Sequence, residues 1–472
     1  MRISKKLALS AAVIIFSSSV FAGGLLTNTN QNVHFLRNPS RDASYRIDAV
    51  YSNPAALIKL PDGFSFSLNN QSAFQTRTVT AAYPLFVMNG GSETKAYEGT
   101  AKALFIPSLQ AVYNTGKWAF SANIAVVGGG GSLEYKNGLP SFETQVSVLP
   151  VMANQLAASI NPALSNVVSQ YGLDQYLKGS SVTYGVQLGA TYKINEMFSA
   201  FAGARLAIAN NAYEGYLKNI SINPNVPMTP FNGSMVKASD FLNGLVAAGF
   251  VPAAQVAPFL TQVADKEINC SQSGLGIAPI LGLNVSYEKL NIGLKYEFQT
   301  NVELKNSTKK DDTGLFPDGA KTNADIPALL TAGVSYKITD NLEASVGYHH
   351  YFDKSAKMKE SAQKLLSGNT NEFSAGLEYR INKTFLVSGG AQLTRHGLSD
   401  EYLTDMNYTT NSYSVGIGGE VTLTKNLKLN VGYLLSQFSD YKEKETLLNG
   451  QPVNLTYART SHCFGIGLDF AF

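Results

Sequence analysis

Cysteine and tryptophan are scarce in this chain of 472 residues, which has two Cys and one Trp. Small exported domains without a large core are commonly held together by several disulfides. Two cysteines exclude a framework of that kind. Whether Cys270, which we place in a loop, and Cys463, in the last expected strand, form a disulfide depends on how close the fold brings them, and the sequence leaves this open.

Long apolar runs are equally few. One follows Arg2, Lys5 and Lys6, extends from Leu7 to Phe16, and leads into small residues up to Ala22. A basic start, a short apolar core and small residues before a cleavage site are typical of a secretory signal peptide. We therefore expect residues 1–22 to be removed on export. The rest of the chain has no apolar run of about 18 residues, which excludes helical membrane spans.

An excess of charge is also lacking. The chain has 37 Lys and Arg against 34 Asp and Glu, and three of the basic residues lie in the expected signal peptide, so the mature chain is balanced and has no charge that favours nucleic acid. The five His show no metal-ligand spacing, and neither a GxSxG elbow nor a nucleotide-binding loop is present. We expect no metal, no cofactor and no enzymatic activity.

From Asp62 onward, apolar and polar residues alternate at every second position. In 290–305 one set of alternate positions is apolar or aromatic, and the other holds Gly, amides and charges such as Lys295 and Glu297. This period is typical of β-strands. Fourteen segments show it, at about 63–76, 102–113, 118–133, 182–194, 198–217, 275–287, 290–305, 326–338, 342–352, 373–381, 385–394, 412–423, 427–438 and 453–472.

The connections between these segments alternate in length. Turns of two or three residues alternate with longer loops, at 77–101, 134–181, 218–274, 306–325, 353–372, 395–411 and 439–452. Outer-membrane barrels have short periplasmic turns and long outer loops, and a soluble multi-blade protein would not alternate so regularly. A lumen enclosed by fourteen strands is too wide for side chains alone to fill, so the polar face points inward. We predict an all-β fold, a 14-stranded antiparallel transmembrane outer-membrane β-barrel over residues 62–472.

Residues 23–61 do not alternate. Near their end is Asn53-Pro54-Ala55-Ala56-Leu57. Pro54 fixes φ, lacks an N–H and disfavours helix at Asn53, so this stretch turns and cannot join a strand ladder. We interpret 23–61 as a plug inside the barrel; a loop turn at the barrel mouth is the alternative.

A signal peptide, this motif, fourteen strands and a terminal Phe472 together resemble the FadL family, the transporters of long-chain fatty acids and aromatic hydrocarbons in Gram-negative outer membranes. The resemblance covers the whole mature chain, and the Asn-Pro-Ala motif is its most specific part. It implies that residues 23–61 are a hatch with Asn53, Pro54, Ala55, Ala56 and Leu57 near the bound ligand. Phe472 resembles the signature that the barrel assembly machinery recognises.

The third expected strand meets Gly128, Gly129, Gly130 and Gly131. Four glycines disfavour a regular strand because they carry maximal backbone entropy and no side chains, so we expect a bulge or gap. In the FadL family the third strand kinks inward and opens the wall to lipid, and the resemblance implies the same for this run. The alternative is a flexible start to the long loop.

Two long loops carry apolar residues at helical spacing, and such helices must bury that face against each other, lipid or ligand. One helix is expected after Ser239 as its N-cap, another after Pro252, and a third along a stripe from Val148 to Val168. In the FadL family such helices form a groove that captures ligand; mutual packing is the alternative. The groove residues that we expect are Phe241, Leu242, Leu245, Val246, Phe259 and Leu260.

The resemblance also implies a basic residue for a fatty-acid carboxylate. Arg205 and Lys295 lie on the lumen face and are the candidates, although Lys295 and Glu297 could neutralise each other. We therefore predict a monomeric barrel in outer-membrane lipid that passes hydrophobic small molecules by loop capture, a hatch-gated pocket and lateral exit. The alternatives are a porin for hydrophilic solutes, with an open charged constriction, and a surface-binding or structural barrel.

Overall fold

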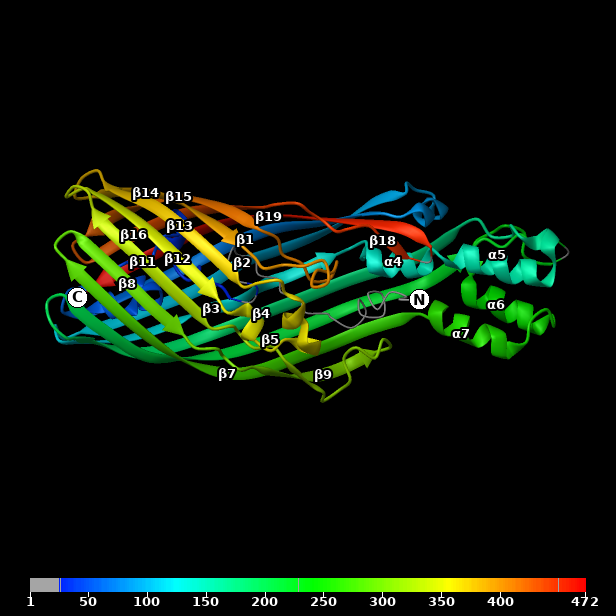
Figure 1. Ribbon diagram of the computed structural model, residues 1–472, viewed down its shortest axis with the longest axis horizontal. Helices are drawn as coiled ribbons and strands as arrows, with labels where there is room; N and C mark the ends of the chain where they lie inside the picture. The colour runs from blue at the N-terminus through cyan, green and yellow to red at the C-terminus, as the bar shows by residue number, and fades with distance from the viewer. Residues whose placement is uncertain (1–24, 26, 228, 449) are drawn as a thin grey trace.

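The chain forms a single antiparallel sheet that closes on itself (Figure 1). The computed structural model describes residues 25, 27–227, 229–448 and 450–472; the expected signal peptide, residues 1–22, lies outside the described residues. The first strand, β1 (Gly63–Ala82), pairs with β2 (Thr94–Asn114) on one side and with the C-terminal β19 (Gln451–Ala471) on the other. This closure pairs the first and last wall strands, which would otherwise be free edges.

The predicted 14-stranded antiparallel barrel is confirmed. Two wall strands are interrupted, one into β8 and β9 and one into β10 and β11. The wall strands are β1, β2, β3 (Trp118–Tyr135), β4 (Tyr171–Lys193), β5 (Phe198–Ile222), β7 (Lys266–Tyr287), β8 (Leu290–Glu297) with β9 (Glu303–Asp311), β10 (Lys321–Asn323) with β11 (Leu329–Lys337), β12 (Leu342–Tyr351), β13 (Thr370–Arg380), β14 (Phe385–Arg395), β15 (Ser412–Thr424), β16 (Leu427–Phe438) and β19. Three short strands add to the loops, β6 (Val236–Lys237), β17 (Tyr441–Lys442) and β18 (Thr446–Leu448).

All the short turns lie at one end of the barrel, here called the turn end, and the long loops lie at the other, the loop end (Figure 1). Near the turn end, aromatic side chains point outward and are exposed, among them Phe64, Tyr113, Trp118, Tyr287 and Phe385. Aromatic rings prefer the boundary between lipid and water. The terminal Phe472 stacks on Phe66, and its N–H donates to the carbonyl of Phe64.

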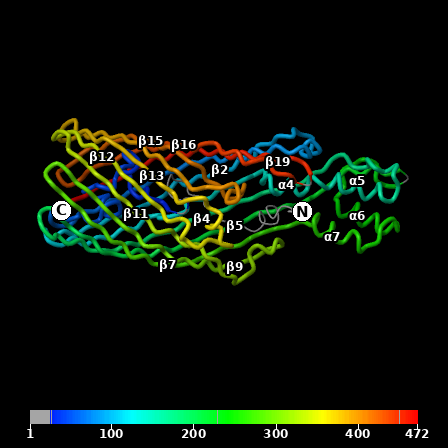
Figure 2. Tube along the Cα trace, in the orientation of Figure 1, coloured from blue at the N-terminus to red at the C-terminus, as the bar shows by residue number. Residues whose placement is uncertain are grey.

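The wall is taller on one side than the sequence predicts (Figure 2). The predicted loops 134–181 and 218–274 are too long, because β4 begins at Tyr171 and β7 at Lys266. In the lipid belt apolar residues point outward, as Leu281 does; beyond it they point inward, as Ile268 does. The apolar residues therefore change from the outer face to the inner face along each tall strand. A search for a single alternating run stops where this change occurs.

Two smaller predictions about strands are also wrong. Cys270 lies in strand β7 rather than in a loop, and both cysteines are free thiols. The predicted strand 290–305 is divided into β8 and β9, opposite Pro279 of β7. Proline has no N–H to donate to a ladder, and the N–H of Phe298 instead reaches the Pro279 carbonyl.

Among the described residues, the loop end carries four α-helices, α4 (Pro140–Val146), α5 (Leu149–Ile160), α6 (Ala238–Ala247) and α7 (Ala253–Val263) (Figure 1). Helix α7 follows Pro252 as predicted. The predicted N-cap Ser239 is wrong, because α6 begins at Ala238 with Lys237 before it. The third stripe is α-helical over α5, continues in the 3-10 helix η3 (Pro162–Leu164), and ends before Val168. Among the described residues, none of the helices has the length and apolar character to cross a membrane.

Candidate functional site: the hatch and the wall around it

The described residues of the segment 23–61, the hatch, fill the turn-end part of the lumen. They form α2 (Val33–Arg37), α3 (Ala49–Ser52) and the 3-10 helix η1 (Pro54–Lys59). Polar contacts reach strands all around the wall: Asn32 meets Gln110 of β2, His34 meets Asp469 of β19, and Arg41 meets Glu378 of β13. Contacts on opposite sides show that the chain here is enclosed by the barrel.

Glycines on the inner face make room for the hatch. A Cβ placed on Gly333 of β11 would lie 2.6 Å from Cβ of Asp42, and one on Gly432 of β16 would lie 2.9 Å from Cβ of Leu36. Real Cβ atoms do not approach other carbon atoms this closely, so neither position accepts a larger residue without a shift of the hatch. The glycines of the polar alternate face therefore have a packing role.

The Asn53–Leu57 motif is bound to one side of the wall. The Asn53 side chain donates to the carbonyl of Ser44 within the hatch and to the Asn284 side chain of β7. The carbonyls of Pro54 and Ala55 accept from Thr191 of β4 and from Ser199 of β5, each at 2.6 Å. Ala56 and Leu57 are fully buried. The motif thus fixes η1 against three adjacent strands.

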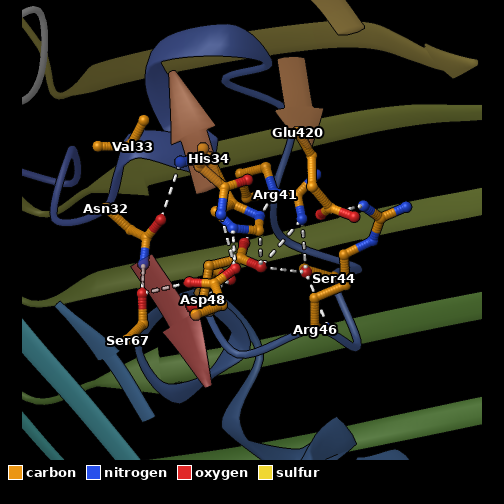
Figure 3. A network of polar contacts seen from close by, with 12 residues as sticks. Asn32, Val33, His34, Arg41, Ser44, Arg46, Asp48, Ser67 and Glu420 are labelled. Carbon is orange, nitrogen blue, oxygen red and sulfur yellow. Dashed lines mark hydrogen bonds and ion pairs between the residues drawn. The ribbon is translucent and has the colours of Figure 1, made fainter. Parts of the chain in front are cut away.

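Three arginines of the hatch converge on wall carboxylates. The Glu378 carboxylate lies 2.8 Å from Arg46 and 3.1 Å from Arg41, with Arg37 at 3.8 Å. Figure 3 shows Arg41 and Ser44 beside Asp48 within the hatch, and Glu420 of β15 opposite Arg46. Buried charges are tolerated when they are paired and hydrogen-bonded. The sequence analysis did not predict this cluster. Two features could have indicated it: three arginines in the non-alternating segment, and two glutamates at strand positions that face the lumen.

Two histidines link the hatch and the wall in the same way. The ring of His34 in the hatch contacts Asp469 of β19 at 2.9 Å, and Asp469 also accepts from Ser67 of β1. The ring of His349 on β12 contacts Asp42 of the hatch. His349 is buried, whereas its neighbour His350 meets Asn371 on the other face, as expected for adjacent strand residues. Within the described ranges no cluster of His, Cys, Asp and Glu suits a metal ion.

Arg205 and Lys295 share one carboxylate. Arg205 of β5 and Lys295 of β8 both form ion pairs with Glu297, and Lys295 also donates to the Tyr51 carbonyl of the hatch. Arg205 keeps two guanidinium nitrogens, Nε and Nη1, without hydrogen-bond partners among the described residues. Of the two carboxylate candidates, Arg205 therefore has donors to spare and Lys295 is engaged.

The wall is interrupted at the glycine run. The β2–β3 ladder pairs Leu109 with Ile124, then resumes only at Lys102 with Ser132. The β3–β4 ladder continues alongside, with two irregularities at the glycines. Gly129 and Gly131 have φ of 68° and 124°, a region that favours glycine. Residues 103–108 of β2 and 125–131 of β3 therefore face each other without ladder hydrogen bonds.

The lipid-facing side of the wall is hollowed beside this interruption. The hollow has a volume of about 590 Å³ and lies across β16, β19, β1, β2 and β3. Its walls are largely apolar, formed in part by Leu68, Phe105, Pro107, Ile124 and Ile466. An apolar hollow in the lipid belt can hold a hydrophobic molecule or an acyl chain.

The loop-end half of the lumen holds a large apolar cluster next to two buried arginines, Arg77 of β1 and Arg459 of β19. Inward side chains of the tall strands, including Val79, Leu133 and Tyr213, pack with Met358, Tyr402 and Met406 of the loops in one buried cluster. Leu139 and Phe142, at the start of α4, belong to the same cluster. A packed hydrophobic cluster thus occupies part of the lumen on the loop-end side of the polar hatch.

The loop helices leave a small apolar groove between them, with a volume of about 20 Å³. Leu242 of α6 and Phe259 of α7 line it together with Leu149, Met152 and Leu156 of α5. The other predicted groove residues, Phe241, Leu245, Val246 and Leu260, belong to the hydrophobic cluster beneath it, and Phe241 is nearly inaccessible. The structure therefore brings the predicted apolar residues together, partly by mutual packing and partly as groove walls.

The comparisons with known proteins agree on the architecture. A family model described as outer membrane protein beta-barrel domain matches residues 275–470. A comparison with curated protein sequences gives no match. Among solved structures, a Pseudomonas aeruginosa FadL homologue is similar at a TM-score of 0.64 and 12% identity, covering 95% of this chain and 99% of that one.

Two toluene transporters are also similar. The P. putida transporter TodX has a TM-score of 0.56 and 16% identity, covering 90% of this chain and 94% of that one. The Ralstonia pickettii transporter TbuX has a TM-score of 0.51 and 18% identity, covering 92% and 98%. Identities this low establish the fold. The chain thus has the fold of an outer-membrane β-barrel and is similar in fold to these FadL-type structures.

Proposed function

We propose that this barrel is a channel for the passive uptake of hydrophobic small molecules across the outer membrane. The observation that carries the proposal is the change in lumen chemistry along the barrel axis: apolar side chains at the loop end, and a polar hatch that closes the turn end. A porin for hydrophilic solutes needs a water-filled lumen with a charged constriction. An apolar solute needs apolar contacts along its route, and the loop-end cluster offers them.

The proposed path has three parts. The groove on α5, α6 and α7 captures the molecule from the medium. The apolar cluster in the lumen then receives it above the hatch. A shift of the hatch lets it leave sideways through the interruption at Gly128–Gly131, past the apolar hollow and into the membrane. We assign no catalytic step and no cofactor to this path, and we propose that the barrel acts as a monomer, with Phe472 as the residue that the assembly machinery recognises.

The ligand class is the finer part of the proposal. Two of the similar structures are described as toluene transporters and a third as a FadL homologue. For a fatty acid, Arg205 is the residue that we propose for the carboxylate, because its guanidinium has unused donors. In Arg205→Gln, which leaves Glu297 paired with Lys295, we expect uptake of a fatty acid to fall and uptake of toluene to persist. Equal loss of both would count against a role in carboxylate recognition.

The whole proposal is tested by uptake and by conductance. A strain that lacks the protein should take up a labelled hydrophobic compound more slowly, and the gene should restore the rate. In planar bilayers the purified protein should give small currents because the hatch closes the lumen. Large steady currents would favour the porin, and normal uptake by the deletion strain would favour a binding or structural role.

A further inference from the structure

The interruption in the wall has its own inner cover. Where β2 and β3 separate, the carbonyls of Val126 and Val127 lack partners on β2. Both are bonded by a single hatch residue: the backbone N–H of Asn28 donates to Val127 at 2.8 Å, and its side-chain amide donates to Val126 at 2.9 Å. The hatch thus satisfies two consecutive carbonyls at a point where β3 has no partner on β2 and a register shift against β4 between Val126 and Gly128.

Asn28 is held in this position by its own segment. Its side-chain oxygen accepts from the N–H of Asn30 at 3.0 Å, and its carbonyl accepts from the side chain of Gln31 at 3.0 Å. Asn28 is 1% exposed. These bonds fix the side-chain amide so that it points at the wall and not into the lumen.

The neighbouring amides extend the cover across three strands. Asn30 accepts from Gln71 of β1 at 3.0 Å, Gln31 accepts from Asn123 of β3 at 2.7 Å, and Asn32 donates to Gln110 of β2 at 2.5 Å. These contacts come from β1, β2 and β3, the strands on either side of the interruption. The described residues 27–32 are all buried.

We propose that residues 27–32 are the inner seal of the lateral opening, with Asn28 as the residue that holds it shut. Buried carbonyls without partners cost free energy, so the gap is stable when Asn28 is present and becomes accessible when the segment leaves. This inference rests on the proposed lateral exit and names the part of the hatch whose movement controls it. Movement of the remainder of the hatch, including the arginine cluster, is not needed to open the wall.

The first experiment measures the seal without transport. Hydrogen exchange is followed in the purified mature protein for Asn28→Ala and for the matched control Asn38→Ala, a buried hatch amide that contacts Ser345 on another part of the wall. Asn28→Ala removes one wall hydrogen bond and should raise exchange in 103–108 and 125–131 by about two- to tenfold. Unchanged exchange there, or an equal rise with Asn38→Ala, would overturn the proposal.

The second experiment locks the seal reversibly. The variant pairs Asn28→Cys with Gly128→Cys in a background in which Cys270 and Cys463 are replaced by Ser. Oxidation should form a disulfide and reduce uptake of a labelled hydrophobic compound at least tenfold, and a reductant should restore it. A pair that does not cross-link, or a cross-linked protein with full uptake, contradicts the seal. If the wild type takes up no hydrophobic compound, the proposed function fails, while the exchange experiment still decides whether residues 27–32 cover the gap.

Discussion

The ring of His349 on β12 contacts Asp42 of the hatch, with 2.8 Å between Nε2 of the ring and Oδ1 of the carboxylate. Its other nitrogen, Nδ1, lies 2.8 Å from Glu372 of β13. Carboxylate oxygens accept, so both ring nitrogens donate and the ring is an imidazolium in this arrangement. The hatch and two wall strands are thus joined through one buried cation.

Replacing this ring should loosen the hatch. His349→Leu leaves Asp42 and Glu372 buried without their common cation, and breaking such a pair costs about 3–5 kcal/mol. We expect Arg37, Arg41 and Arg46 to become sites of tryptic cleavage. The matched control is His350→Leu, one residue along on the other face, which should leave the hatch protected; equal cleavage in both variants would show that the strand, and not the contact with Asp42, is affected.

Removing Glu378 should have a larger effect on the lumen than removing any single arginine that faces it. Glu378→Gln leaves Arg37, Arg41 and Arg46 close together with less negative charge, and like charges in a buried site repel. We expect larger and noisier currents in planar bilayers. Arg46→Gln removes the partially exposed member of the group and should change the current less. Identical currents for the two variants would contradict the central position of Glu378.

A side chain on the inner glycines should displace the hatch. Gly333→Val places atoms where Asp42 already lies, since even a Cβ would be 2.6 Å from Cβ of Asp42. The control is Gly389→Ala on β14, where the nearest atom to a new Cβ is 3.5 Å away. We expect faster hydrogen exchange throughout the hatch for Gly333→Val only. Slow exchange in both would mean that the hatch adapts to the added volume.

The loop that begins at Asp353 should respond to acid through two groups with opposite signs. Asp353 accepts from the N–H of Thr370, and the Thr370 hydroxyl contacts His396. Burial raises the pKa of Asp353 from 3.8 to about 6, so its stabilising contribution is present below about pH 4 and is lost as the pH rises through 6. Burial lowers the pKa of His396 from 6.5 to about 4, so its contribution is present above pH 6.5 and is lost as the pH falls.

Single variants should separate these effects, each worth about 3 kcal/mol. In Asp353→Asn, His396 is the member of the pair that still titrates, so residues 353–372 should exchange hydrogen faster at pH 4.5 than at pH 7 after correction for the intrinsic rates. In His396→Gln, Asp353 is the member that still titrates, and exchange should become slower at pH 4.5. The same direction in both variants would rule out this pair as the source of the pH dependence.

The apolar groove should tolerate charge poorly if it captures ligand. Leu242→Lys places a cation on the groove wall formed with Met152 and Phe259 and should lower the uptake rate at low concentrations of a hydrophobic compound. Asn243→Lys adds the same charge at the next, exposed position of α6 and should leave uptake unchanged. Normal uptake by both variants would leave the groove without a role in capture.

The sequence predicts the part of the barrel that lies in lipid and fails where the environment changes. Leu281 and Leu283 alternate with polar or small residues because one face meets lipid and the other the lumen, so their strand was found. Farther along the same strand, Ile268 packs inward and Asn269 faces the medium. The alternation is as regular there, but the apolar residues now face inward. A search for one continuous alternation therefore leaves these residues out of the strand.

The hatch contacts could not be predicted from the sequence. Arg41 and Glu378 are 337 positions apart, and no local pattern relates two residues at that distance. Lys295 and Glu297 are the exception, because a spacing of two on one strand places both side chains on the same face, and they do form an ion pair. The odd or even position of a residue along its strand thus identified which charges face the lumen. Which of these charges form pairs depends on how the barrel closes.

The inner glycines have a consequence for exchanging parts between related channels. Gly333 and Gly432 leave spaces that Asp42 and Leu36 fill, so the inner surface of this wall is complementary to its own hatch. A plug transplanted from a barrel with side chains at these positions and small residues of its own would leave voids, and the reverse transplant would collide. The hatch and the wall therefore have to match in shape, and a chimera of two related channels should exchange both together.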